Sequence, residues 1–397
     1  MNSVAFLKAN FLLPNGVDMN KWSVIACDQY TSDQDYWKNV EQIVGENPSA
    51  LRLILPEVYL AKDNSPRVEK INESMHAYLD AGILKEYNDC YIYLERTLAS
   101  GVVRPGIVGV VDMEQYSYIE GVKCDIKPTE KTVPERIPPR KAVRDKAQLE
   151  LAHVILFCND KENSLVGYLA SKKNQMKKIY DFEMMMDGGH IAGWLVDGEI
   201  CKEFDKKYAE YCVLMEAQNT PQLIVGDGNH SLATAKSVYE DDKTNKKARY
   251  AMVELQNIYD DSIAFEPIHR VLFDIDVENF LKFVESKTKG AYPIQWMTAS
   301  SKGELMIDVK ANQIPIETLQ PIIDEYLLTH QGDIDYVHDG VEKIVSEHKN
   351  SLGIFLPAIQ KGEIFDRIAT QGVYPRKTFS VGEANDKRFY LEARIIK

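Results

Sequence analysis

The chain has 397 residues, more than a single hydrophobic core usually supports, so two or three packed subdomains are expected. Its composition, 45% hydrophobic and 27% charged, is that of a folded globular protein and excludes extensive disorder. The net charge of −13 argues against a general nucleic-acid binder, which needs a basic face to neutralise phosphates. A small anionic ligand remains compatible with this charge, because a few local cations can hold it.

The N-terminal apolar stretch at residues 4–13 predicts a strand. It contains Lys8 and Asn10 and has no small-residue cleavage site, so it is not typical of a signal peptide. No run reaches the ~18 apolar residues that a membrane helix requires. The six cysteines are scattered without CxxC or zinc-type spacing, which predicts buried free thiols in a reducing compartment. We therefore expect a cytoplasmic protein that is not associated with a membrane.

Up to about residue 274, apolar strand-like runs alternate with amphipathic stretches, a pattern that predicts a mixed α/β (α+β) fold. Strands are expected at 4–13, 23–26, 91–96, 107–112, 153–158, 222–225 and 251–255. Helices are expected at 32–44, 66–87, 163–180 and 199–214. The turn residues Asp187, Gly188 and Gly189 predict a hairpin between strands at 182–186 and 191–196.

The later part of the chain predicts a second, smaller α/β subdomain. Helices at 277–287, 316–331 and 340–348 alternate with short strands at 304–309 and 353–356. The expected division is a main domain at 1–274, a smaller subdomain at 275–360, and a C-terminal segment at 361–397 that packs back on the main domain.

A glycine-containing turn follows the apolar run at 222–225. Its residues are Gly226, Asp227, Gly228, Asn229, His230 and Ser231, and an Ala/Leu-rich helix begins at once. Glycine lets the backbone approach a ligand closely, and a helix N-terminus offers unpaired N–H groups and a positive dipole end. The pattern therefore predicts an anion site. Alternatively, the polar residues only shape the turn and Ser231 only caps the helix.

A basic, proline-rich stretch carries Arg136, Arg140 and Arg144 within an otherwise acidic protein. Its three prolines predict an ordered surface loop, since helix and strand tolerate proline poorly. Arginine binds phosphate and carboxylate bidentately, so the stretch is a second candidate for anion binding. The alternative is a solvated basic surface paired with neighbouring acidic residues.

Two further segments contain side chains suited to catalysis. Glu266, His269 and Arg270 could supply an acid–base group and an anion clamp, or form an ion pair at a domain edge. Asp28 follows the strand at 23–26, where an active-site loop or a helix-leading turn would both fit. Signatures of P-loop kinases and of dinucleotide-binding folds do not occur, so those standard enzyme classes are not expected.

These segments resemble the bacterial and archaeal domain-of-unknown-function family 1015 over nearly the whole chain. The resemblance is carried by residues 27–32, 129–133, 136–140, 226–235, 265–270 and 377–384. The central turn is also similar to the Asp-Gly-His-His-Arg type motif of the ParB/sulfiredoxin-like superfamily, which includes free-serine kinases. This second resemblance implies a ParB/sulfiredoxin-like mixed-sheet core that binds phosphate at the turn.

Carried over to this sequence, Asp227, Gly228 and His230 match the superfamily motif, and His230 would contact a nucleotide phosphate. Asn229 stands where the kinases have His and sulfiredoxins have the reactive Cys, which excludes sulfiredoxin-type reduction. Ser231 stands where Arg usually holds phosphate. The resemblance therefore implies that one of the arginines named above supplies the missing positive charge.

The combined expectation is a phosphoryl-transfer enzyme that acts on serine, phosphoserine or a similar small metabolite. The phosphorylated ligand would be bound by Gly226, Gly228, Asn229, Ser231, Arg136, Arg140, Arg144, His269 and Arg270. The catalytic candidates are Asp28, Asp227, His230 and Glu266, with Mg²⁺ and ATP or ADP as expected cofactors. The kinase and phosphatase directions stay open, as does a homodimer. The rival interpretations are a non-catalytic nucleotide- or metabolite-binding regulatory protein and a purely structural subunit.

Overall fold

The computed structural model of the chain describes residues 3–60 and 63–397. It divides into two compact units, one formed by Met1–Ile263 with Gly382–Lys397 and the other by Ala264–Val381. The division expected from the sequence put boundaries at 274 and 360 instead. The second unit begins earlier because the strands at 265–267 and 269–273 both pair with strands of that unit.

The first unit is built on a large mixed sheet, which confirms the predicted mixed α/β class. Over the described residues, β11–β6 and β12–β8 are its parallel strand pairs, and its other strand pairs are antiparallel. β1 pairs with β5, and β10 joins β4 to β9. In spatial order the main strands are β6 (Ile126–Lys127), β11 (Leu223–Asp227), β8 (Ile155–Cys158), β12 (Tyr250–Asn257), β5 (Val103–Asp112), β4 (Leu84–Thr97), β2 (Ala9–Pro14), β21 (Ala393–Ile395) and β7 (Leu149–Leu151), with β1 (Phe6–Leu7), β10 (His190–Val196) and β9 (Lys177–Glu183) beside them.

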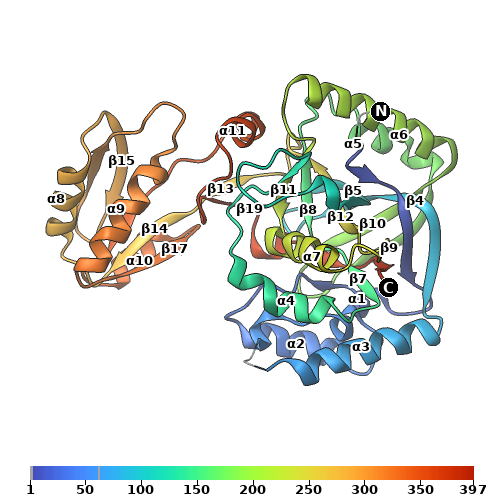
Figure 1. Cartoon of the computed structure of the whole chain (residues 1–397). Helices are drawn as coiled ribbons and strands as arrows, with labels where there is room; N and C mark the ends of the chain where they lie inside the picture. The colour runs from blue at the N-terminus through green and yellow to red at the C-terminus, as the bar shows by residue number, and fades with distance from the viewer. Residues whose placement is uncertain (1–2, 61–62) are drawn as a thin grey trace. The chain divides into compact units, whose positions relative to one another are not determined.

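Both faces of this sheet are buried. Successive side chains of a strand point to opposite faces, so Tyr91 and Tyr93 of β4 enter one core while Ile92 and Leu94 enter the other. The core with Ile92 is closed by α2 (Gln34–Val44) and α3 (Ser65–Asp80), and the core with Tyr91 by α5 (Val166–Lys172), α6 (Gly198–Ala217) and α7 (Asn229–Asp241) (Figure 1). Smaller elements are α1 (Met19–Trp22) and the pair β3 (Val24–Ile25) and β20 (Phe389–Tyr390).

Two predicted helices are shorter than expected, because the sequence after each of them forms a strand. The helix predicted at 66–87 ends at Asp80, where Gly82 turns the chain with a φ of +65° into β4. The helix predicted at 163–180 ends at Lys172, and the residues from Lys177 form β9. Pairing with a neighbouring strand, β2 for residues 84–87 and β10 for the start of β9, overrides local helix propensity in both segments. The hairpin of β9 and β10 is confirmed.

The predicted proline-rich loop is wrong, because most of it is helical. A 3₁₀ turn at Pro134–Arg136 leads into the helix α4 (Ile137–Arg144). Pro138 and Pro139 lie in the first turn of α4, where backbone N–H groups have no partner within the helix. Proline is tolerated there, so it starts this helix and does not break it.

The second unit contains an antiparallel five-stranded sheet in the order β16 (Lys302–Ile307), β15 (Tyr292–Met297), β18 (Leu352–Ile354), β14 (His269–Phe273) and β17 (Asp333–Val337). The helices α8 (Val277–Lys287) and α9 (Pro315–Thr329) share a core with this sheet through Phe280, Leu319 and Ile323. The unit also contains α10 (Val341–Glu347), α11 (Ile364–Thr370) and a ribbon of β13 (Phe265–Pro267) and β19 (Phe379–Val381). Across the described residues, no helix combines the length and apolarity needed to span a bilayer.

Candidate functional site

The glycine-containing turn lies where the sequence predicted it, between a strand and a helix. β11 ends at Asp227, Gly228 is the N-cap residue with a φ of +81°, and α7 begins at Asn229. A Cβ atom on Gly228 would lie 3.1 Å from the Cα of Val154. Leu232 N donates to Gly228 O at 3.0 Å, so the N–H groups of residues 229–231 precede this first helical bond. The turn therefore requires glycine and opens a helix N-terminus.

Replacement of Gly228 by alanine is expected to lower the free energy of unfolding by about 1–3 kcal/mol, because it adds left-handed strain and a contact with Val154. Gly101→Ala is the matched control, since Gly101 has a φ of +82° and an added Cβ would meet no described atom within 4 Å. Urea unfolding should show a larger loss for Gly228→Ala. Equal losses would mean that the approach of Val154 does not constrain the turn.

The segment before α4 holds the start of α7 through hydrogen bonds. Thr129 Oγ1 donates to the carbonyl of Val225 at 2.7 Å, and Asn229 Nδ2 donates to Thr129 Oγ1 at 3.4 Å. The backbone N–H of Val133 donates to Nε2 of His230 at 3.2 Å. Nε2 of His230 is thus an acceptor, which leaves Nδ1 to carry the proton in the neutral ring.

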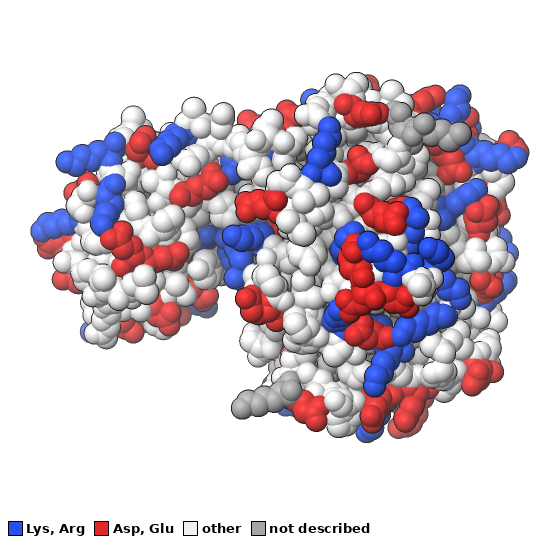
Figure 2. All heavy atoms as spheres, viewed as in Figure 1, with Lys and Arg blue, Asp and Glu red and all other residues white. Residues whose placement is uncertain are grey.

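Helix α4 packs against α7 (Figure 1), which brings the two predicted anion-binding segments together in the first unit. Lys141 Nζ donates to Ser237 Oγ at 3.2 Å and forms an ion pair with Asp241. Arg136 is exposed, and its carbonyl accepts from Arg140 at 2.8 Å. Acidic and basic side chains are interspersed over the visible face of this unit (Figure 2), so the basic residues do not form an uninterrupted positive surface.

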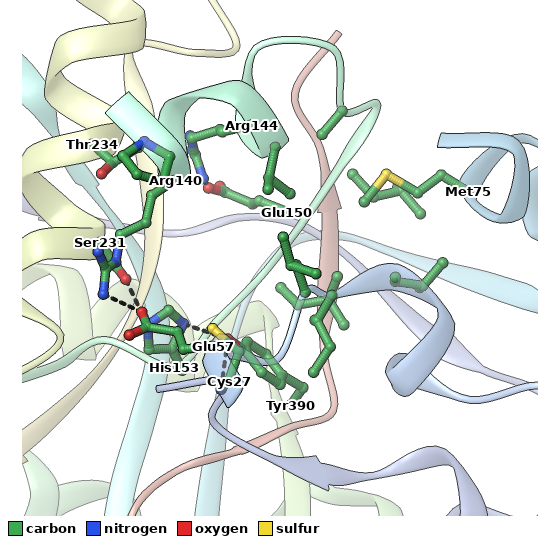
Figure 3. A pocket seen from close by; sticks show the side chains of 18 of the residues that line it. Cys27, Glu57, Met75, Arg140, Arg144, Glu150, His153, Ser231, Thr234 and Tyr390 are labelled. Atoms are coloured by element: carbon green, nitrogen blue, oxygen red, sulfur yellow. Dashed lines mark hydrogen bonds and ion pairs between the residues drawn. The ribbon is translucent and has the colours of Figure 1, made fainter. Parts of the chain in front are cut away.

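A cavity of about 140 Å³ opens between these elements (Figure 3). Arg140 and Arg144 of α4 and Ser231 and Thr234 of α7 contribute to its polar lining. Arg140 forms an ion pair with Glu57, and Arg144 forms one with Glu150. Much of the remaining wall is apolar and consists of Leu53, Ile54, Leu55, Leu60, Met75, Val143, Ala147, Leu149 and Leu151.

A chain of hydrogen bonds that sequence reasoning missed lies at the polar end of this cavity. Nε2 of His153 is 2.7 Å from Ser231 Oγ, and its Nδ1 is 3.0 Å from Tyr390 Oη. Tyr390 Oη in turn donates to Cys27 Sγ at 3.1 Å. Burial lowers the pKa of His153, although Asp28 and Asp227 act in the opposite direction. The histidine is therefore held in its neutral form at neutral pH.

Asp227 and Asn229 present buried oxygens at the turn. Burial raises the pKa of Asp227 and the neighbouring Asp28 adds to the effect, while Lys387 Nζ, 4.0 Å from Oδ1, opposes it. Among the described residues, neither Asp227 Oδ2 nor Asn229 Oδ1 has a hydrogen-bond partner. Asp28 Oδ1 accepts from Gln29 Nε2 at 3.2 Å. These oxygens suit a cation or a donor from a ligand.

Mg²⁺ fits this turn only in part. The described residues contain no group of three or more His, Cys, Asp or Glu side chains that could hold a metal ion. Mg²⁺ is commonly bound by one or two carboxylates together with substrate phosphates and water. Asp227 and Asn229 could supply protein oxygens to such an ion, whereas the remaining ligands would have to come from the phosphate and solvent.

Glu266, His269 and Arg270 belong to the second unit. Glu266 lies in β13 opposite Ser380, and His269 Nδ1 accepts from the backbone N–H of Leu356 at 3.0 Å. Arg270 is fully buried, where it donates to Gln320 Oε1 at 2.7 Å and to the carbonyl of Ile268 at 2.6 Å. The roles assigned to these three residues from the sequence stay predictions.

The chain is distantly similar to several proteins of known structure, and no curated protein matches it in sequence. A free serine kinase in complex with AMP is 10% identical with a TM-score of 0.39, covering 72% of this chain and 90% of that chain. A conserved hypothetical protein from Pyrococcus furiosus is 9% identical with a TM-score of 0.38, covering 72% and 94%. SbnI with a C-terminal truncation from Staphylococcus aureus is 10% identical with a TM-score of 0.36, covering 69% and 82%.

The family comparison agrees with the resemblance seen in the sequence. A model described as a protein of unknown function, DUF1015, matches residues 13–358, which is well over half of the 397 residues. The matched range includes the turn at the start of α7, the arginines of α4 and His153, and ends before Tyr390. The chain belongs to the DUF1015 family of proteins of unknown function.

Proposed function

We propose that the chain catalyses phosphoryl transfer on a small molecule, with serine or phosphoserine as the favoured substrate. One observation carries this proposal: the first turn of α7 and the arginines of α4 line the same cavity. A helix N-terminus favours anions, and the guanidinium group of arginine binds phosphate oxygens bidentately. The choice of serine comes from the resemblance of the turn at 227–230 to that of free-serine kinases.

In this proposal the phosphate lies at the N-terminus of α7, where the N–H groups of residues 229–231 precede the first helical bond. Arg140 approaches from the cavity wall and must exchange Glu57 for the phosphate. Burial raises the pKa of Glu57, and this effect outweighs that of Arg140. Protonation of Glu57 is therefore easier than for an exposed glutamate, and it would release Arg140 to bind the anion.

Asp227, Asn229 and Asp28 supply two roles in this proposal. Asp227 and Asn229 would hold Mg²⁺ that arrives with ATP or ADP, and the bound ion would neutralise charge on the transferring phosphoryl group. Asp28, which lies close enough to influence the pKa of Asp227, would accept the proton of the attacking hydroxyl. His230 would donate from Nδ1 to a phosphate oxygen, because its Nε2 is engaged with Val133.

A second candidate function is a non-catalytic nucleotide- or metabolite-binding regulatory protein. The observation that favours it is the pairing of Arg140 with Glu57 and of Arg144 with Glu150. Both guanidinium charges already have carboxylate partners, so neither can stabilise a transition state until its ion pair opens. The kinase and phosphatase directions both need the same phosphate site, so these contacts do not separate them.

The test is an assay of the purified full-length protein with Mg²⁺. We expect either phosphate release from phosphoserine or an ATP- or ADP-dependent phosphorylated product from serine. A bound ligand at 100 times its Kd should add about 2.7 kcal/mol to the stability, which a thermal shift screen can detect. Nucleotide binding without turnover would replace the enzyme proposal with the regulatory one. If neither binding nor turnover occurs, both proposals are wrong.

A further inference from the structure

Ser231 and His153 form a close side-chain pair at the wall of the cavity (Figure 3). Ser231 Oγ and His153 Nε2 are 2.7 Å apart, a normal distance for a strong hydrogen bond. Ser231 is the third residue of α7 and lies in the first turn of this helix. The imidazole is buried, and Asp227 and Asp28 are among the charges that act on it.

The partners of His153 fix the position of its proton. If Nε2 accepts the hydroxyl proton of Ser231, the neutral ring carries its own proton on Nδ1 and donates it to Tyr390 Oη, 3.0 Å away. Tyr390 Oη can accept that bond because its own proton goes to Cys27 Sγ at 3.1 Å. The rings of His153 and Tyr390 also pack edge to face, with centroids 5.2 Å apart. Serine, base and orienting group therefore stand in the order that nucleophilic catalysis uses.

We infer that Ser231 is a covalent nucleophile that carries the transferring phosphoryl group, with His153 as its base. This inference rests on the proposed phosphoryl-transfer function and names an intermediate for it. In the first step Ser231 Oγ bonds to phosphorus, its proton passes to His153 Nε2, and the bond from phosphorus to the donor's oxygen breaks. If the donor is a phosphomonoester, its departing alkoxide takes that proton. If the donor is a nucleoside triphosphate, the nucleoside diphosphate leaves as an anion and the proton passes to solvent.

The second step reverses the first on a new acceptor. A water molecule or an acceptor hydroxyl attacks the phosphoryl group on Ser231, and in this two-step route its proton passes to His153 Nε2 and not to Asp28. The bond from phosphorus to Ser231 Oγ breaks, and the serine oxygen regains a proton from the imidazole. Arg140 lines the same cavity and would face the charged phosphoryl group. The apolar part of the wall would limit the access of water to the intermediate.

The inference is tested by trapping the intermediate on the full-length protein. The protein is incubated with phosphoserine, or with ATP and Mg²⁺, then quenched in acid and examined by intact mass and peptide mapping. We expect one phosphoryl group on Ser231. The adduct should be absent in Ser231→Ala and should form roughly 10²–10⁴-fold more slowly in His153→Gln. Ser237→Ala is the matched control, because Ser237 lies on the same helix, contacts Lys141 and does not line the cavity.

A fluorophosphonate probe tests the nucleophile without any assumption about the natural donor. Attack by Ser231 Oγ forms an oxygen–phosphorus bond, releases fluoride and passes the serine proton to His153. Labelling of Ser231 in the native protein, lost in Ser231→Ala and slowed in His153→Gln, would support the inference. Native protein that leaves Ser231 unlabelled would overturn it, whether or not phosphoryl transfer is observed.

The outcomes separate this inference from the proposed function. Turnover that persists in Ser231→Ala, with no phosphoryl adduct in the wild type, would overturn the covalent intermediate and leave the phosphoryl-transfer function in place. Absence of turnover with every donor would contradict the proposed function, and the fluorophosphonate result would then decide the nucleophile on its own. Circular dichroism of each variant checks that a lost adduct does not reflect unfolding.

Discussion

Asp227→Asn is expected to lower the rate of phosphoryl transfer roughly 10²–10³-fold, the range over which one group that stabilises transition-state charge contributes. The substitution keeps the shape of the side chain but removes the charge at the start of α7. In the proposed function that charge helps to hold Mg²⁺ beside the phosphate. A buried oxygen with no hydrogen-bond partner among the described residues is also the atom that a ligand would contact first.

The same variant should not be less stable than the wild type at neutral pH. Burial, with a contribution from Asp28, raises the pKa of Asp227 in the folded protein above its unfolded value. Because the pKa is raised in the folded protein, the protonated carboxyl is the form that stabilises the fold. Its contribution to the free energy of unfolding is complete below the unfolded pKa and is lost as the pH rises through the folded pKa. At neutral pH the ionised carboxylate therefore costs stability, and asparagine removes that cost.

The measurement compares kcat and Tm for the wild type, Asp227→Asn and the control Asp80→Asn. Asp80 is an exposed carboxylate at the end of α3 in the same unit. We expect a slow Asp227→Asn enzyme whose Tm at pH 7 equals or exceeds that of the wild type, and the Tm difference should shrink as the pH falls. An unchanged rate would remove Asp227 from the catalytic site. A clear loss of Tm at pH 7 would contradict the cost assigned to its ionised form.

The turn at the start of α7 could be predicted because its signals are local. An apolar run, two glycines and an Ala/Leu-rich run follow one another directly, and the structure has β11, the turn and α7 in that order. Helix α4 could not be predicted by the same reasoning, because proline breaks a helix when it lies in the helix interior. In the first turn of a helix, where Pro138 and Pro139 lie, proline is favoured. Only the residues after these prolines show that a helix continues.

The hydrogen-bonded chain at the cavity could not be predicted, because no local motif marks it. Cys27, His153 and Tyr390 are separated by more than a hundred residues at each step and meet only when the sheet forms. The same holds for the pairing of Arg140 with Glu57, 83 residues apart. Sequence patterns identified the arginine, and the fold determined which carboxylate neutralises it.

The strongest effect on stability is expected for Glu150→Gln, which should lower the free energy of unfolding by about 3–5 kcal/mol. Glu150 has only 5% of its surface exposed and pairs with both Arg144 and Arg394, with Arg394 Nε 2.6 Å from Oε1. Burial alone would raise the pKa of Glu150, but the two guanidinium groups outweigh it and hold the pKa below its ordinary value. Glutamine keeps one acceptor oxygen, replaces the other with an NH₂ donor, and leaves two largely buried cations without a countercharge.

Urea unfolding at pH 7 measures this loss. Tryptophan fluorescence is a suitable signal for the first unit, because three of the four tryptophans lie there: Trp22, Trp37 and Trp194. Glu199→Gln is the control. Glu199 pairs with Lys202 on the surface, and its side chain is 87% exposed, so the substitution should change the free energy of unfolding by about 0–1 kcal/mol. A carboxyl group whose pKa is lower in the folded protein stabilises the fold at pH values above its unfolded pKa. This stabilisation is lost as the pH falls through the folded pKa. The gap between wild type and Glu150→Gln should therefore close in acid, and a gap that persists there would show that packing, and not charge, accounts for the loss.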